Sequence, residues 1–194
     1  MEGKKLFRMF IAIQFSDEVI KEVARVQKLI SKQKFTGKLT ELENIHLTLK
    51  FLGEIDFEMA EKVQKKLEEI KINEITAKLG GIGTFCRKNS CIVWIKLNGK
   101  ELFELQKKID DLLKGFFKPE ERFMSHITVG RVKYVKDIKN FKKMIESISV
   151  RKIGFKIKKF QLKLSELNPL WPVYSNIKEY NLNNWDETQI KKLI

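Results

Sequence analysis

Histidine, cysteine and proline are all scarce in this chain, as are long apolar runs. The scarcity of cysteine and of long apolar runs excludes several classes of protein. The 194 residues include two His, two Cys and three Pro. Two cysteines do not make the disulfide framework of a small secreted domain, and they cannot supply the four ligands of a structural zinc site. No apolar run approaches the roughly 20 residues that a membrane-spanning helix needs. We therefore expect a compact protein with no membrane segment and no bound metal or other cofactor.

The N-terminal apolar run carries no sign of a secretion signal. Phe7 to Phe15 is interrupted by Arg8 and Gln14 and is followed by no small-residue cleavage site, so we interpret it as a strand. This interpretation predicts a cytoplasmic protein. Cys86 and Cys91 would meet across a hairpin, but in a reducing compartment we expect free thiols.

Acidic residues are too few to balance the basic ones. The formal net charge is +14 and 39 residues are Lys or Arg, against 25 Asp or Glu. Such a charge favours a polyanionic partner, of which nucleic acid is the commonest, because phosphates attract Lys and Arg. A surface that is merely rich in lysine remains the alternative, since composition alone identifies no partner.

Strand and helix patterns alternate along the whole chain, which predicts the α+β class. Period-2 alternation indicates strands, and apolar residues at three- and four-residue spacing indicate helices. The expected strands are Met9 to Phe15, Ile45 to Leu52, Ile75 to Phe85, Cys91 to Leu97, Ser125 to Val135 and Val173 to Tyr180. The expected helices begin at Ser16, Asp56, Lys100 and Asp137, and a polar loop through Gly37 follows the first. The tail after Asn181 is expected to be a short helix or frayed.

A change of phase divides the segment that follows the fourth helix. Ile153, Phe155 and Ile157 alternate on odd positions, whereas Phe160, Leu162 and Leu164 alternate on even ones. This requires a bulge or the meeting of two strands at positions 158–159. No Gly-, Ser- or Pro-rich linker interrupts the chain, so we expect residues 1–194 to form a single domain.

Both histidines open the same four-residue phrase. His46-Leu47-Thr48-Leu49 and His126-Ile127-Thr128-Val129 each read His, aliphatic, Thr, aliphatic, although only seven Thr occur in 194 residues. On a strand, residues i and i+2 point to the same face, so each phrase presents an imidazole beside a hydroxyl. Each phrase also precedes an Asp that opens a helix, by ten and eleven residues. This near-repeat predicts two related lobes, each contributing one such strand across a pseudo-twofold axis.

Two imidazoles and two hydroxyls are suited to displacement at phosphorus. An imidazole titrates near pH 6.5, so one ring can act as base towards water while the other donates a proton to the departing oxygen. The hydroxyls of Thr48 and Thr128 can donate to the non-bridging oxygens, where negative charge gathers. No metal ion is required, and neither phrase supplies the additional ligands that a metal site needs. The near-symmetry itself does not decide which histidine is the acid.

These phrases resemble those of the 2H phosphoesterase superfamily, and more narrowly the RNA 2',3'-cyclic phosphodiesterases known as LigT-like 2'-5' RNA ligases. The resemblance runs from Arg8-Met9-Phe10-Ile11-Ala12-Ile13 through the extended motif His46 to Glu54, Trp94 and the second motif with Arg131. It ends with Leu162 to Leu167 and Pro172-Val173-Tyr174. It implies a bilobal α+β fold in which mainly antiparallel sheets line a central cleft, with the helices outside.

The resemblance also implies an activity and roles. The activity is opening of an RNA-terminal 2',3'-cyclic phosphate to a 2'-phosphate. His46 is implied as proton donor and His126 as proton acceptor, with Thr48, Thr128 and Arg131 as phosphate contacts. The implied partners are RNA ends or nucleoside 2',3'-cyclic phosphates, acted on by a monomer. The same chemistry in reverse would join RNA ends through a 2'-5' linkage, and an RNA-binding module with inactive phrases is the alternative from another class. A metal-dependent hydrolase is a remote alternative.

Four positions qualify the resemblance. Ser125 stands where the family usually has Pro, and Trp171 stands where it has Gly before the last Pro. Trp171 would either stack on a base or pack in the core. Strict alternation places Arg131 opposite His126, so Arg131 reaches the cleft only if a bulge forms near Gly130. Strict alternation places Lys50 on the same face as His46 and Thr48, where it would either add positive charge or, like most surface lysines, have no specific role.

Overall fold

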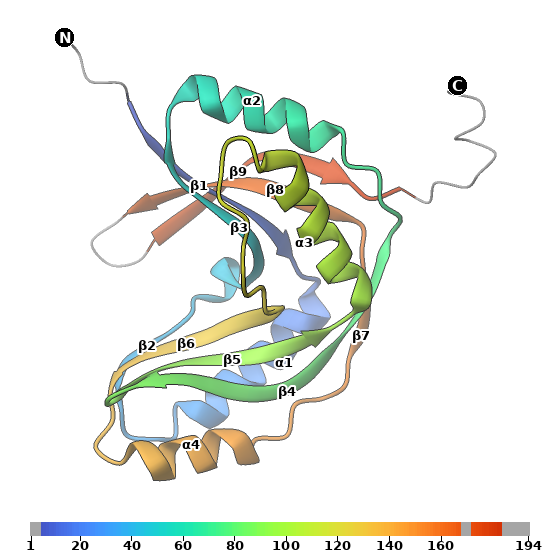
Figure 1. Ribbon diagram of the computed structural model, residues 1–194. Coiled ribbons are helices and arrows are strands. Elements are labelled where there is room, and N and C mark those ends of the chain that lie inside the picture. The colour runs from blue at the N-terminus through green and yellow to red at the C-terminus, as the bar shows by residue number, and fades with distance from the viewer. Residues whose placement is uncertain (1–4, 168–171, 184–194) are drawn as a thin grey trace.

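Two antiparallel sheets form the framework, and each contains one of the two histidine strands. The structure, a computed structural model, describes residues 5–167 and 172–183. The first sheet has the order β3 (His46–Ile55), β1 (Phe7–Gln14), β8 (Lys159–Leu167) and β9 (Pro172–Asn181). The second has the order β2 (Thr36–Leu39), β6 (His126–Tyr134), β5 (Ser90–Asn98), β4 (Ile75–Arg87) and β7 (Gly154–Ile157) (Figure 1). The α+β fold expected from the sequence is confirmed.

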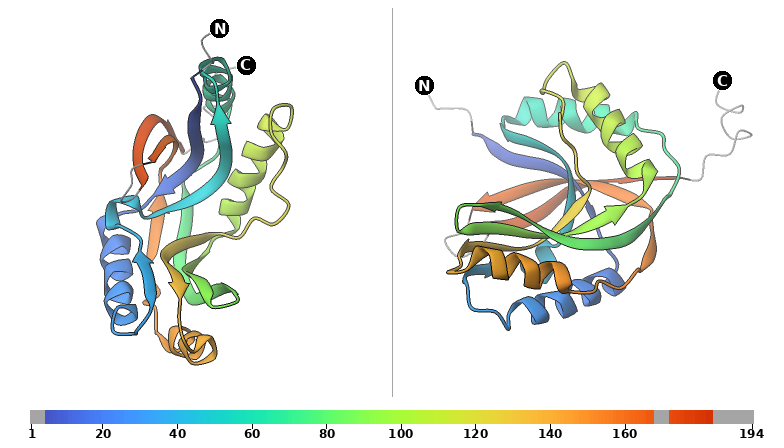
Figure 2. Two further views of the ribbon diagram at one scale, coloured as in Figure 1. Left: turned by 90° about the vertical axis from the view of Figure 1, so that its left-hand side faces the viewer. Right: turned by 60° about the horizontal axis from the view of Figure 1, so that its bottom comes forward.

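In the part of the chain that the structure describes, four α-helices lie outside the two sheets. They are α1 (Asp17–Ile30), α2 (Phe57–Glu68), α3 (Lys100–Leu113) and α4 (Ile138–Ser147), and a 3-10 turn, η1 (Leu42–Asn44), precedes β3. Helices α2 and α3 lie beside the first sheet, and α1 and α4 lie beside the second (Figures 1 and 2). Asp56 and Asp137 cap α2 and α4, because their side chains accept hydrogen bonds from the N–H groups of Met59 and Asn140. No helix in the described part of the chain is long and apolar enough to cross a membrane.

Alternation along the strands separates the core from the cleft. In β1, Met9, Ile11 and Ile13 belong to the hydrophobic core that the helices cover. Phe10 and Ala12 are equally buried but lie outside that core cluster, because successive side chains of a strand point to opposite faces. The opposite face of the first sheet is therefore the one that lines the central cleft, and it carries His46.

The connections between the sheets cross over. Helix α1 follows β1 of the first sheet but packs against β6 of the second, whereas α3 follows β5 of the second sheet but packs against β3 of the first. The helix that follows a central strand of each sheet thus packs on a strand of the other sheet, and α3 contacts β4 of its own sheet as well. The single-domain assignment for residues 1–194, with two lobes related by a pseudo-twofold axis, stays a prediction with which this crossing agrees.

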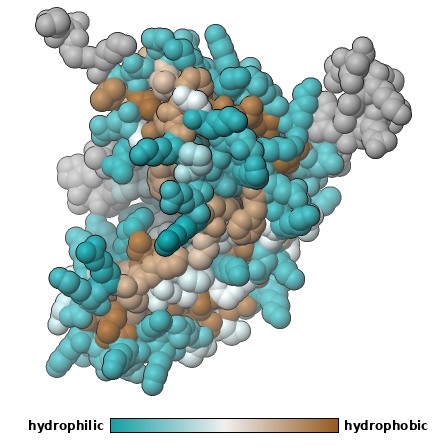
Figure 3. Space-filling view, viewed as in Figure 1, coloured by the Kyte–Doolittle hydropathy of each residue, from teal (hydrophilic) through white to brown (hydrophobic). Residues whose placement is uncertain are grey.

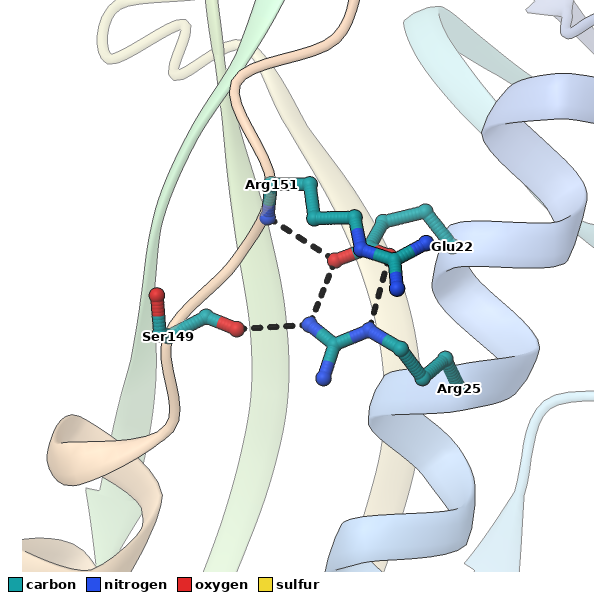
Figure 4. Close-up of polar contacts among 4 residues, drawn as sticks. All are labelled: Glu22, Arg25, Ser149 and Arg151. Atoms are coloured by element: carbon teal, nitrogen blue, oxygen red, sulfur yellow. Dashed lines mark hydrogen bonds and ion pairs between the residues drawn. The ribbon is translucent and has the colours of Figure 1, made fainter.

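A buried carboxylate fastens α1 to the segment after α4. Glu22 is 2% exposed and accepts hydrogen bonds from the Nε and Nη2 atoms of Arg25, at 2.8 and 2.6 Å, and from the backbone N–H of Arg151 at 2.9 Å (Figure 4). Arg25 also donates to the carbonyl oxygen of Ser149 at 2.6 Å. Burial raises the pKa of Glu22, but these hydrogen bonds outweigh it and hold the pKa below its ordinary value. The carboxylate therefore remains charged and keeps α1 on the second lobe.

Most element positions expected from the sequence are confirmed. The phase change at positions 158–159 is the boundary between β7 and β8, which belong to different sheets. The polar loop through Gly37 is corrected, because Thr36–Leu39 forms the edge strand β2 on β6. A segment of four residues, half of them exposed, shows too little alternation for a strand to be recognised. The tail from residue 184 lies outside the described residues.

The expectation of free thiols is wrong in this structure. Cys86 and Cys91 face each other directly in the β4–β5 register, with their Cα atoms 4.1 Å apart, and form a disulfide. Such a separation is that of a closely spaced cross-strand pair, in which side chains approach most nearly. The number of cysteines indicates the redox compartment, whereas this disulfide depends on the pairing of the two strands of the hairpin.

Lys50 is also corrected, because it does not reach the cleft. Between Thr48 and Lys50 the strand advances two residues while its partner β1 advances one, from Ala12 to Ile11. This bulge turns the Lys50 side chain towards α3, where it is buried, forms an ion pair with Asp110 and donates to the carbonyl oxygen of Lys118 at 2.8 Å. Lys50 therefore joins the histidine strand to a helix.

The Lys50–Asp110 pair provides a test of this packing. Asp110→Ala should lower the free energy of unfolding by about 3–5 kcal/mol, because it leaves a buried ammonium group without its partner. Asp111→Ala is the matched control on the same helix, since its ion pair with Lys107 is exposed and should contribute at most about 1 kcal/mol. Urea unfolding followed by circular dichroism measures both. Equal losses for the two variants would contradict the assigned role of Asp110.

Candidate active site

The His46 ring is fixed on both of its nitrogen atoms. Its Nδ1 lies 2.7 Å from the carbonyl oxygen of Asn44, and its Nε2 lies 3.0 Å from the Thr48 hydroxyl. A carbonyl oxygen only accepts, so Nδ1 carries the hydrogen and Nε2 of the neutral ring accepts from Thr48. The side-chain amide of Asn44 donates in turn to the carbonyl oxygen of Pro172 at 3.0 Å, which ties this turn to β9.

His126 repeats the same local arrangement in the second sheet. Its Nδ1 lies 2.7 Å from the carbonyl oxygen of Met124, again two residues upstream. Nδ1 therefore donates here too, and Nε2 is the nitrogen that can exchange a proton. Both rings are thus held in the same tautomer by their own strands, and the repeated phrase produces a repeated geometry.

The two histidine strands lie close together across the cleft. β3 and β6 belong to different sheets, yet they contact each other. The charge of His126 acts on His46, so the rings lie within electrostatic range of each other. Figure 3 shows a notch between the upper and lower parts of the molecule on the left of the view. The structure thus places the His46–Thr48 phrase on β3 and the His126–Thr128 phrase on β6, two strands that contact each other, and the joint role of the four residues stays a prediction.

A bulge in β6 turns the Arg131 side chain towards the cleft. Between Thr128 and Gly130 β6 advances two residues while β5 advances one, from Trp94 to Val93. Val132 therefore faces the core, and Arg131 is exposed on the side of His126. Its charge acts on His46 and Tyr174, which belong to the opposite sheet.

Close strand packing holds this second bulge in place. A Cβ on Gly130 would lie 2.9 Å from the Leu39 side chain, so glycine permits the approach of β2. Gln27 of α1 donates to the carbonyl oxygen of Val129 at 3.0 Å. The crossing helix of the first lobe thus supports the bulge that directs Arg131.

His46 is neutral in the unliganded protein. Burial lowers its pKa to about 4, against the opposing hydrogen bond to Asn44, and the charges of Lys163, Arg131 and His126 lower the pKa further. Three cationic or ionisable groups therefore surround one buried ring. An anion placed among them would counter this repulsion and favour the protonated ring. The site has the electrostatic character of an anion-binding site.

Several residues around His46 were not predicted as site residues from the sequence. The rings of Phe10 and Tyr174 lie 5.1 and 5.4 Å from the His46 ring, centroid to centroid. Lys163 is 3% exposed and its ammonium group donates to the side-chain oxygens of Gln161 and Asn176. The polar positions of β8 were available as a signal, since 161, 163 and 165 alternate with apolar ones. That pattern normally indicates a solvent-facing side, and here the side faces the cleft.

The departure at Ser125 has a structural explanation. Ser125 is 1% exposed, its hydroxyl donates to the carbonyl oxygen of Leu97 at 2.7 Å, and its own carbonyl oxygen accepts from the N–H of Leu97 at 2.9 Å. The residue extends the pairing of β6 with β5 up to His126. Trp171, the other departure, lies outside the described residues.

The residues present favour no metal centre. Among residues 5–167 and 172–183, no three His, Cys, Asp or Glu side chains lie close enough together to hold a metal ion. The two histidines also have their Nδ1 atoms committed to carbonyl oxygens.

Comparison with known proteins agrees with this geometry. The family model described as LigT like Phosphoesterase matches residues 13–94 and again residues 95–174. Together these ranges cover most of the chain. The chain belongs to the LigT-like phosphoesterase family. Each matched half of this phosphoesterase contains one histidine phrase, so the near-repeat in the sequence corresponds to the two matches of the family model.

Curated relatives extend over nearly the whole chain. An RNA 2',3'-cyclic phosphodiesterase of Methanocaldococcus jannaschii is 36% identical over 176 residues, covering 89% of this chain and 99% of the relative. A protein of the same name from Thermotoga maritima is 35% identical over 179 residues, covering 89% and 94%. This LigT-like chain therefore spans the length of these relatives.

Solved structures show the same fold. A crystal structure of a Thermus thermophilus protein matches with a TM-score of 0.80 at 20% identity, covering 92% of this chain and 100% of the other. Escherichia coli LigT complexed with 3'-AMP matches with a TM-score of 0.71 at 20% identity, covering 92% and 99%. The bilobal phosphoesterase fold is thereby established for this family member.

The state of His46 can be measured directly. In ¹⁵N-detected NMR titrations of the unliganded protein, the His46 ring should stay neutral down to about pH 4, with the hydrogen on Nδ1, because burial and neighbouring charges lower its pKa. The His126→Gln variant assigns the resonance, since only one ring then remains. A His46 ring that is cationic at pH 6 would contradict the described environment.

Proposed function

We propose that this phosphoesterase opens the 2',3'-cyclic phosphate at the end of an RNA and leaves a 2'-phosphate. The observation that supports it most is the pair of imidazoles, both held in the Nδ1–H form by carbonyl oxygens, on strands that meet across a basic cleft. The curated relatives named RNA 2',3'-cyclic phosphodiesterase support the substrate class. The net charge of +14 suits an RNA ligand.

The proposed reaction needs one base and one acid. His126 Nε2 accepts a proton from water while the water oxygen attacks phosphorus. The bond from phosphorus to the 3'-oxygen breaks, and His46 Nε2 donates its proton to that oxygen. The 2'-oxygen keeps the phosphoryl group. Thr48, Thr128 and Arg131 donate to the non-bridging oxygens, where charge accumulates. No metal ion takes part in this scheme.

The acid role of His46 requires that it gains a proton with the substrate. In the unliganded protein its pKa is lowered to about 4, so the ring is neutral near pH 7. A cyclic phosphodiester brings one negative charge beside the cations Lys163 and Arg131, and this counter-charge raises the pKa of His46. The Thr48 hydroxyl, which donates to Nε2 in the unliganded protein, then turns to the phosphate. Substrate binding is thus coupled to proton uptake.

Replacement of either histidine tests the proposal. His46→Ala and His126→Ala should each lower kcat for a short oligonucleotide ending in a cyclic phosphate by roughly 10²–10⁴-fold. The product of the parent protein should carry a 2'-phosphate, and a saturating chelator should leave the rate unchanged. Unfolding midpoints near the parental value would show that the variants fold. A folded double variant with the parental rate would contradict the proposed mechanism.

A substrate with a better leaving group distinguishes acid from base. In a cyclic phosphorothiolate with sulfur at the bridging 3' position, the departing thiolate needs little protonation. The loss caused by His46→Ala should therefore shrink at least about tenfold on this substrate, whereas the loss caused by His126→Ala should persist. The opposite pattern would assign the acid role to His126 and reverse the proposed roles.

A further inference from the structure

An exposed aromatic ring lies directly beside His126. Phe85 is at the end of β4 and is 45% exposed, yet its ring meets the His126 ring edge-on, with centroids 5.7 Å apart and an interplanar angle of 88°. Phe85 also contacts Trp94 of β5, at 5.2 Å between centroids. It belongs to neither histidine phrase. A large apolar ring left open next to a polar site is a candidate for ligand contact.

Trp94 provides the support beneath this ring. Trp94 pairs with Thr128 on one side and with Gly83 on the other. A Cβ on Gly83 would lie 2.5 Å from two carbons of the indole, so the glycine leaves room for the indole to lie against β4. The indole Nε1 is buried and has no hydrogen-bond partner among the described residues. Packing alone therefore holds the indole in place, and it supports Phe85 with its face.

The disulfide keeps Phe85 where it is. Phe85 pairs with Ile92, and the next pair towards the hairpin end is Cys86 with Cys91, joined covalently. Ile92 pairs in turn with Arg131, so the aromatic residues and the guanidinium lie on neighbouring strands. A ring that is already ordered loses little conformational entropy when a ligand stacks on it.

We propose that Phe85, supported by Trp94, stacks on the base of the terminal nucleotide, the one that carries the cyclic phosphate. This proposal rests on the proposed function and adds a base-binding subsite to it. The Phe85 ring meets the His126 imidazole edge-on, so a base that extends from a ribose bound between the histidines lies within its reach. Base stacking on aromatic side chains is the usual way in which proteins bind unpaired nucleotides. Because every base has a π face, the subsite accepts all four and favours the larger purines.

The experiment compares substrates with and without a base. Phe85→Ala should raise KM for adenosine 2',3'-cyclic phosphate by roughly 5- to 100-fold, the range expected for loss of one stacked base. KM for 1-O-methylribose 2,3-cyclic phosphate, which has no base, should change less than about twofold. Phe85→Trp should keep the parental preference for the base, and Phe85→Leu should lose most of it. Phe103→Ala is the matched control, since Phe103 is also 45% exposed but lies on α3 against Phe123.

Two outcomes would overturn the subsite. An equal loss of kcat on both substrates would make Phe85 a positioning residue for His126. Phe51 is 65% exposed on the opposite sheet, and its ring centroid lies 6.1 Å from that of Phe10. If Phe51→Ala abolished the preference for the base and Phe85→Ala did not, the base would bind on the first sheet.

Binding measurements separate this proposal from the proposed function. Calorimetry with adenosine 2'-monophosphate and with 1-O-methylribose 2-phosphate gives the ratio of their dissociation constants without any turnover. Phe85→Ala should raise the dissociation constant of the nucleotide relative to that of the sugar phosphate by roughly 5- to 100-fold. A parent protein that binds the nucleotide through Phe85 but hydrolyses no cyclic phosphate would overturn the function and keep the subsite. A ratio unchanged by Phe85→Ala would overturn the subsite.

Discussion

The hydrogen bond from each imidazole Nδ1 to a carbonyl oxygen two residues upstream is the interaction on which the site depends. It sets the tautomer, directs Nε2 away from the strand, and is made entirely within a short segment of chain. The surrounding structure then only has to keep two strands opposite each other. The crossed helices support this placement. So do the hydrogen bonds from α1 to residues 149–151 and the Lys50–Asp110 pair between β3 and α3, because each fastens one element to another.

The bulges explain why similar phrases give different neighbours. Both strands gain an extra residue after the threonine, and in both the residue that follows the bulge turns away from the cleft. In the first strand that residue is Lys50, which forms an ion pair with Asp110 of α3. In the second it is Gly130, which leaves space for β2. The next position faces the cleft in each case and holds Phe51 in one lobe and Arg131 in the other. One lobe thus offers an aromatic ring where the other offers a cation.

Much of this arrangement was accessible from the sequence, and the exceptions have definite causes. Period and capping located the four helices of the described residues, and the paired phrases predicted which histidines and threonines form the site, because these depend on local pattern. Lys50 was misplaced because strict alternation ignores a bulge, and Arg131 was placed only conditionally for the same reason. β2 was missed because a short edge strand depends on its partner. Lys163 was missed because alternating polar positions normally indicate a solvent-facing side, and Phe85 because only the assembled sheets show that its face lines the cleft.

The crossed helices have a consequence for the two halves of the chain. The first matched half, 13–94, contains α1, which packs on a strand of the other half, and the second half contains α3, which does the same in return. Either half alone would expose the apolar face of its first helix. It would also lack the helix of the other half that covers one of its own strands. Each would also hold a single imidazole. A half-length ancestor with this layout would therefore need a second copy, with helices exchanged between the two, before it could fold or hold the opposed pair of rings.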